Sequence, residues 1–123
     1  MALLQLAEWI HDSLPYINAY LGKPKTLDEL NNDANDPQEG CDIHHIFEQT
    51  PGRQSGYPES MIESPANRVR ISTLKHWEIN GWYSIKNKDY GNISPRDYLR
   101  DKGWEERYKV GLDALRRAGV LKS

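Results

Sequence analysis

The residues of this chain with the clearest chemical potential are histidines and asparagines in its middle third. His44 and His45 are adjacent, Asn67 follows at a distance, and His76 and Asn80 are four residues apart. Imidazole nitrogen together with amide oxygen suits a divalent ion such as Mg, Mn, Ni or Zn, and these residue types alone do not choose among the four metals. The pattern therefore predicts a site for one divalent metal ion.

Two strands are expected to carry the first of these residues. The segment Ile43–Glu48 is short, apolar and partly β-branched, which is typical of a strand. Residues 67–71 alternate polar with apolar side chains, which predicts a second strand. The intervening residues 50–66 contain several prolines and glycines and are expected to form a long loop. The sequence thus predicts two strands joined by an extended connection.

A helix is expected to carry His76 and Asn80. Ser72 or Thr73 is a suitable N-cap for a helix that begins near Leu74. Residues four apart share one face of a helix, so His76 and Asn80 are expected to point in the same direction. A ligand from the first strand would complete the metal site.

Helices are also predicted on both sides of this segment. Pro15 should end the first helix near Leu14 or kink it, and Thr26 with Glu29 is the pattern of a capping box for a short second helix. The first helix is predicted by apolar residues at spacings of three and four: Leu3, Leu6, Ala7, Ile10, Leu14, Ile17 and Leu21. Residues 1–30 are therefore expected to be helical.

The C-terminal part is expected to contain two helices within residues 94–120. Ser94 followed by Pro95 is a strong helix start. Gly103 should end that helix, and Gly119 should end the last one. Apolar spacing in the last helix is set by Trp104, Tyr108, Leu112 and Leu115. Two strands among several helices predict one α+β domain that spans residues 1–123.

Composition narrows the possible functions. The chain has 123 residues, of which 37% are hydrophobic and 28% charged, as in one globular domain. A single cysteine, Cys41, excludes an intrachain disulfide. No apolar run is long enough for a bilayer, and the N-terminus lacks the basic region of a signal peptide. A soluble protein without membrane insertion and without its own signal peptide is expected.

Charge is distributed unevenly along the chain. Residues 1–49 carry two Lys and nine acidic residues, whereas residues 50–123 carry fourteen Lys or Arg and nine acidic residues. Ordinary surface charge would explain this. An anionic partner bound to the basic part would also explain it.

The order of a double histidine, an asparagine, and a histidine and asparagine four apart resembles the HNH endonucleases, also called ββα-metal or His-Me finger nucleases. The resemblance covers the middle third of the chain. It implies a ββα-metal core, a β-hairpin plus a helix at about residues 42–83, with further helices before and after it. It also implies a metal-dependent endonuclease that hydrolyses phosphodiester bonds of DNA.

The resemblance implies a role for each motif residue. His45 would be the catalytic base, and Asn67 would hold the connection between the strands so that the base is fixed. His44, His76 and Asn80 would bind one divalent ion. If the first strand is straight, Asp42 shares a face with His44 and becomes the rival ligand. Phosphate charge would be neutralised by Arg68, Arg70 or Lys75.

A narrower resemblance concerns delivery. The runs Leu74–Tyr83 and Ser94–Leu99 are similar to C-terminal toxin domains of polymorphic bacterial toxins, such as Rhs-type proteins. This implies a nuclease delivered by secretion, as part of a larger toxin, into the cytoplasm of a target cell. It also implies a cognate immunity protein, acidic and covering the basic part. The alternatives are an RNase on the same fold, or a non-catalytic module that binds metal or nucleic acid.

Overall fold

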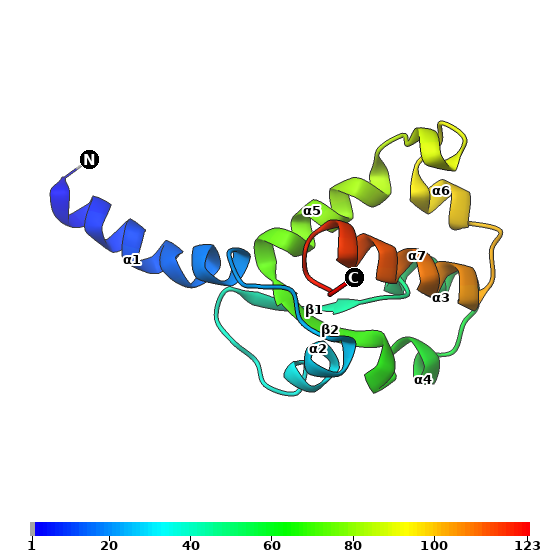
Figure 1. The fold of residues 1–123 in the computed structure, drawn as a ribbon, viewed down its shortest axis with the longest axis horizontal. Helices are drawn as coiled ribbons and strands as arrows, with labels where there is room; N and C mark the ends of the chain where they lie inside the picture. Colours follow the sequence, from blue (N-terminus) through cyan, green and yellow to red (C-terminus); the bar gives the residue numbers. More distant parts are fainter. Residues whose placement is uncertain (1) are drawn as a thin grey trace.

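A two-stranded antiparallel hairpin and the helix that follows it form the centre of the fold (Figure 1). The structure is a computed structural model and describes residues 2–123. β1 (Cys41–His45) pairs with β2 (Arg68–Ser72), and α5 (Thr73–Ser84) follows directly. The other elements of the described chain are α1 (Leu3–Tyr20), α2 (Leu27–Asp33), α3 (Gln49–Gln54), α4 (Glu59–Ile62), η1 (Pro65–Asn67), η2 (Lys88–Tyr90), α6 (Pro95–Leu99) and α7 (Trp104–Arg117). The predicted α+β class, with two strands and a helix in this order, is confirmed.

β1 begins at Cys41 and ends at His45, whereas the sequence predicts a strand over Ile43–Glu48. The chain leaves the strand there because the backbone N–H of Phe47 donates to the side-chain oxygen of Asn67 rather than to a partner strand. In the hairpin, His45 lies opposite Arg68 and His44 opposite Val69. Successive side chains of a strand point to opposite faces, so the two histidines project from opposite faces of the hairpin.

The connection between the strands is not the loop that its proline and glycine content predicts. It contains α3, α4 and η1. The prolines are compatible with these short helices because each stands at a start: Pro51 in the first turn of α3, Pro58 at the N-cap of α4, and Pro65 at the first position of η1. Proline content here marks helix starts, and much of the connection is consequently helical.

The first helix runs through Pro15 without ending there, and none of its residues is buried. Figure 1 shows α1 extending away from the remaining elements. Its second half contacts the other elements: the Pro15 carbonyl lies against Gly40, where a Cβ atom would come within 2.5 Å of it. The Tyr20 hydroxyl donates to Glu78 of α5, and Lys75 lies 4.3 Å from the Tyr20 ring centre. The apolar stripe of α1 is therefore uncovered.

Among residues 2–123, no helix combines the length and the apolar character of a membrane span.

The C-terminal helix packs against the hairpin at the point where β1 ends. Gly111 of α7 allows this approach, because a Cβ atom there would lie 2.1 Å from the carbonyl oxygen of Ile46. Gly119, at φ +76°, follows the helix as predicted. The hydrophobic core lies between hairpin, α5, α6 and α7 and contains Ile46, Val69, Ile71, Ile79, Tyr83, Leu99, Val110, Ala114 and Leu115. The segment after β1 is thus held from behind by α7.

Candidate metal and nuclease site

The four residues expected to act on metal or water border one cavity of about 550 Å³. His44 and His45 come from β1, and His76 and Asn80 come from α5. Ser72 caps α5, since its hydroxyl accepts the Lys75 backbone N–H at 3.2 Å. Although His44 and His45 project from opposite faces of the hairpin, both reach this cavity because it lies at the end of the strand.

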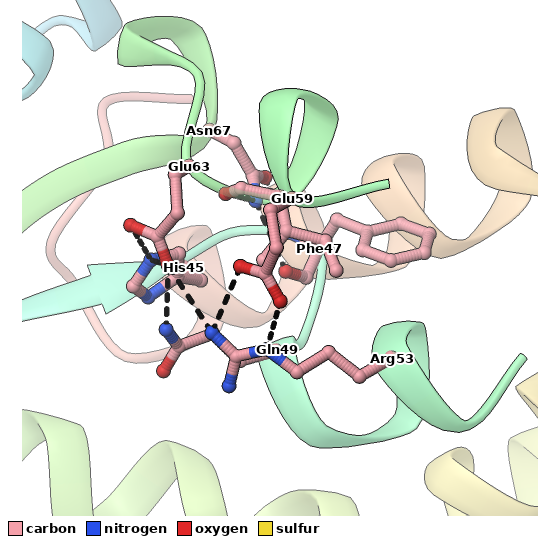
Figure 2. A network of polar contacts seen from close by, with 8 residues as sticks. His45, Phe47, Gln49, Arg53, Glu59, Glu63 and Asn67 are labelled. Atoms are coloured by element: carbon pink, nitrogen blue, oxygen red, sulfur yellow. Dashed lines mark hydrogen bonds and ion pairs between the residues drawn. The ribbon is translucent and has the colours of Figure 1, made fainter. Parts of the chain in front are cut away.

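His45 is paired with a carboxylate from the connection between the strands. Its Nε2 atom lies 3.1 Å and 3.2 Å from the two carboxylate oxygens of Glu63, and Gln49 donates to the same carboxylate at 2.8 Å (Figure 2). The hydrogen bond from His45, then that from Gln49, keeps the pKa of Glu63 below its usual value, against the opposing effect of partial burial. An ionised carboxylate only accepts hydrogen bonds. Nε2 therefore carries the proton, and the lone pair of a neutral His45 ring is on Nδ1.

His76 is held by Asp42, the residue that competed with His44 as a metal ligand. The Nδ1 atom of His76 lies 2.9 Å from one oxygen of Asp42, and the Thr73 hydroxyl donates to the other at 2.9 Å. A metal-ligating histidine commonly donates its second ring N–H to such a carboxylate, which fixes the ring and its tautomer. Both Asp42 oxygens are engaged, and Asp42 does not border the cavity. This geometry suits a positioning role for Asp42, and it leaves His44 as the strand residue beside His76.

His44 is buried, with 4% of its surface exposed, and its ring stands edge-on to that of His76 with 5.1 Å between ring centres. Its Nε2 atom is buried and has no hydrogen-bond partner within the described chain. Burial first, then the proximity of His76 and His45, lowers the pKa of His44 to about 3. The ring is consequently neutral at physiological pH, which is the form that binds a metal ion.

The buried His44 predicts a pH-dependent stability for the metal-free protein. In the unfolded chain this ring titrates near 6.5, and in the folded chain near 3. Between these values the unfolded state binds more protons, so stability decreases as the pH falls. The loss should approach about 1.4 kcal/mol per pH unit. Urea unfolding in the presence of a chelator, at about pH 7 and about pH 5, measures it.

Two variants separate His44 from the other titrating groups. His44→Leu should lose most of this slope, whereas His11→Gln, which removes an exposed histidine of α1, should keep it. An unchanged slope in His44→Leu would show that His44 titrates normally in the folded protein.

Asn67 lies behind the cavity and ties the two ends of the connection together. It is fully buried, its Oδ1 accepts the Phe47 N–H at 2.7 Å, and its Nδ2 donates to the Phe47 carbonyl at 3.1 Å and the Ile62 carbonyl at 2.9 Å (Figure 2). Its own carbonyl accepts the Ile46 N–H at 2.9 Å. Asn67 thus fixes the backbone of Ile46 and Phe47, the residues that directly follow His45.

Two charged residues at this site had no signal of their own in the sequence. Glu63 lies in the connection that was expected to be a loop. Arg96 was expected only as part of a helix start, yet it borders the cavity and binds the Glu48 carboxylate through Nε at 3.2 Å and Nη2 at 2.6 Å. Both contacts join segments far apart in the chain, and no local pattern marks them.

The three basic residues expected to contact phosphate do not border the histidine cavity. Arg68 lies opposite His45 in the hairpin, but it does not border the histidine cavity. Arg70 and Lys75 border another cavity, of about 160 Å³. Arg70 donates to the Asp36 carbonyl at 2.6 Å and lies 3.7 Å from the carboxylates of Asp33 and Asp36, so acidic residues at the end of α2 and after it engage it. The structure therefore does not bring Arg70 and Lys75 to the histidines.

The proposed ligand side chains at the cavity are of chemical types that bind a divalent ion. Two imidazoles and one amide oxygen are suitable ligands, and the unpartnered Nε2 of His44 is the kind of buried nitrogen that costs about 1–3 kcal/mol unless it is bound. Within residues 2–123, no group of three or more His, Cys, Asp or Glu side chains is arranged to hold a metal ion. The predicted set contains only two such residues, with Asn80 as the third ligand.

Comparisons with known proteins found no relative of this chain. No family model, no curated protein and no solved structure matches this chain.

Proposed function

We propose that this chain is a metal-dependent nuclease that hydrolyses phosphodiester bonds of DNA. The observation that supports it most strongly is that His45, whose ring is paired with the Glu63 carboxylate, borders the same open cavity as the neighbouring rings of His44 and His76. The first pair provides a base, and the second provides ligands. Phosphodiester hydrolysis needs both: a group that takes a proton from water, and positive charge at the phosphate.

His45 is the proposed base. Glu63 accepts a hydrogen bond from its Nε2–H, so Nδ1 is the atom that removes a proton from the attacking water. As the ring becomes positively charged, the Glu63 carboxylate stabilises it, as an acid partner stabilises the imidazolium in other histidine-based sites. Asn67 keeps the base in place by fixing the backbone that follows it.

The proposed metal ligands are His44, His76 and Asn80. These three residues would hold one divalent ion, which when bound would supply positive charge to the scissile phosphate and to the departing 3′ oxygen. Asp42 orients His76 through its Nδ1 atom, and burial keeps His44 neutral. The resulting product ends are a 5′-phosphate and a 3′-hydroxyl.

Metal binding is expected to disappear in His76→Ala, because half of the imidazole ligands are removed. Asp42→Asn should bind metal about 10- to 100-fold more weakly, since a neutral amide holds the ring less firmly. Calorimetric titration of the chelator-treated protein with Mn, Ni or Zn measures both effects, and His11→Ala is the matched control that should bind as the wild type does. Unchanged metal affinity in His76→Ala would reject this ligand set.

Incubation of the purified chain with supercoiled plasmid and Mg or Mn tests the nuclease itself. Nicked and linear products that vanish with a chelator are expected. If no divalent ion among Mg, Mn, Ni and Zn supports nicking, the enzyme proposal fails. Offering tRNA in parallel distinguishes a DNase from an RNase on the same fold.

We further propose that the nuclease serves as a toxin domain of a polymorphic toxin and is neutralised by an acidic immunity protein. The support is the resemblance of residues 74–83 and 94–99 to such domains, together with the basic character of residues 50–123. Cytoplasmic expression in a bacterial host should arrest growth for the wild type and not for His45→Ala. Equal growth of both would argue against a toxin.

A further inference from the structure

A second cavity continues from the histidine site along the C-terminal side of the molecule. It has a volume of about 470 Å³ and is lined by Pro51, Gln54, Ser55, Arg96, Arg100 and Arg107. Pro51, Gln54 and Arg96 also line the histidine cavity, so the two spaces meet along α3 and the start of α6. We call this second cavity, with its six lining residues, the arginine groove.

The arginine groove is positively charged. Three guanidinium groups line it and no carboxylate does. The histidine cavity contributes one carboxylate, Glu48, and Arg96 binds both of its oxygens. A concave surface lined by one sign of charge attracts the opposite charge. The continuous space is therefore suited to an anionic chain that passes the histidines.

Arg107 provides a permanent positive charge at the base of the arginine groove. It is 5% exposed, and its guanidinium donates to the carbonyls of Lys102 and Arg100 and to the Ser55 hydroxyl, each at 2.9 Å. Among residues 2–123, no carboxylate forms an ion pair with it, because Glu48 pairs with Arg96 and Asp97 pairs with Arg100. Neutral dipoles hold the group in position but leave its charge uncompensated, so the field extends into the groove.

Arg100 is the residue best placed to touch a ligand. Its side chain is 77% exposed, and its ion partner is Asp97, three residues earlier on α6, at 2.6 Å. Such an exposed pair contributes little, about 0–1 kcal/mol. A phosphate, which arginine can bind through two parallel hydrogen bonds, can therefore replace Asp97 at small cost.

We infer that the arginine groove binds the phosphodiester backbone of the nucleic acid strand on one side of the bond that is cut, with Arg100 contacting a phosphate. The inference rests on the proposed nuclease function. No aromatic side chain lines the groove, so it offers charge and hydrogen-bond donors rather than a stacking surface. Recognition there is consequently of the backbone and independent of base sequence.

The test compares two arginines in matched settings. Arg100→Gln removes the groove contact. The control, Arg116→Gln, removes an exposed arginine of α7 that also pairs with an aspartate three residues earlier, at 3.8 Å. Arg116 lines neither cavity. Both are made in a His45→Ala background, and binding of labelled duplex DNA is measured at about 50 mM and about 200 mM salt. Circular dichroism checks that the variants are folded.

Arg100→Gln should weaken binding about 5- to 10-fold at about 0.1 M salt and reduce the slope of log affinity against log salt by about 1, as expected for the loss of one phosphate contact. Arg116→Gln should change neither quantity. In the active protein, Arg100→Gln should raise KM more than it lowers kcat, because a distant backbone contact contributes equally to ground state and transition state.

The outcomes separate this inference from the proposed function. If the wild type cuts DNA and Arg100→Gln binds with the same affinity and salt slope as Arg116→Gln, the inference is overturned and the nuclease stands. If Arg100→Gln alone weakens binding but the wild type never cuts DNA, the groove is a nucleic-acid site and the nuclease proposal fails.

Discussion

His45→Ala should reduce cleavage of plasmid DNA by about 10²- to 10⁴-fold, the usual contribution of a general base. The reason is geometric. Glu63 is hydrogen-bonded to Nε2 of His45, so Nδ1 is the free proton acceptor at the cavity. No other described histidine there has both a free ring nitrogen and a carboxylate partner from the connection between the strands. Initial rates of plasmid nicking, with Mg or Mn in excess, measure the effect.

Further variants separate loss of the base from loss of the site. His45→Ala should retain metal affinity by calorimetry, because His45 is not a proposed ligand. Glu63→Gln should lower the rate by less than His45→Ala does and should leave His45 in place, since an amide can still accept a hydrogen bond but does not stabilise a charged ring. His11→Ala should cut as the wild type does. A His45→Ala protein that cuts at the wild-type rate would remove His45 from the mechanism.

Asn67→Ala should lower the free energy of unfolding by about 3–5 kcal/mol. The substitution leaves the Phe47 N–H, the Phe47 carbonyl and the Ile62 carbonyl without their buried partner. Each unsatisfied buried group costs about 1–3 kcal/mol, partly offset by local rearrangement. Urea unfolding followed by tryptophan fluorescence measures the change, and failure to fold at all would be the same result in its extreme form.

Asn80→Ala is the matched control for stability. Asn80 is exposed on α5, and its side chain makes no hydrogen bond within the described chain. Its replacement should change stability by no more than about 0.5 kcal/mol, and the better helix propensity of alanine favours a small gain. If Asn67→Ala were also within 1 kcal/mol of the wild type, Asn67 would not be the residue that holds the connection.

Local sequence patterns were sufficient for much of the fold. Thr26 forms the predicted capping box with Glu29, and Ser72 and Ser94 cap the helices that follow them. These predictions succeed because a cap depends on a side chain and a backbone N–H only three residues apart. The shared face of His76 and Asn80 follows from helix geometry in the same way, and both border the cavity.

Patterns that depend on distant neighbours were misleading. The apolar stripe of α1 forms the predicted helix, but no element of the described chain packs over most of it. Of the two outcomes expected at Pro15, an end or a kink, the end near Leu14 is excluded, because a proline removes one hydrogen bond while the turns on either side keep theirs. The connection between the strands forms α3 and α4 because its prolines stand where a helix does not need their missing N–H.

The sequence by itself determined which residues are chemically able to act: two adjacent histidines, an asparagine at the start of the second strand, and a histidine and asparagine on one helix face. Only the tertiary structure decided how they pair. It directed Asp42 to His76, left a nitrogen of His44 without a partner, and brought Glu63 to His45 and Arg96 to Glu48. The physical reason is that these contacts depend on strand register and on the packing of segments far apart in the chain, and neither is encoded in the local spacing of residues.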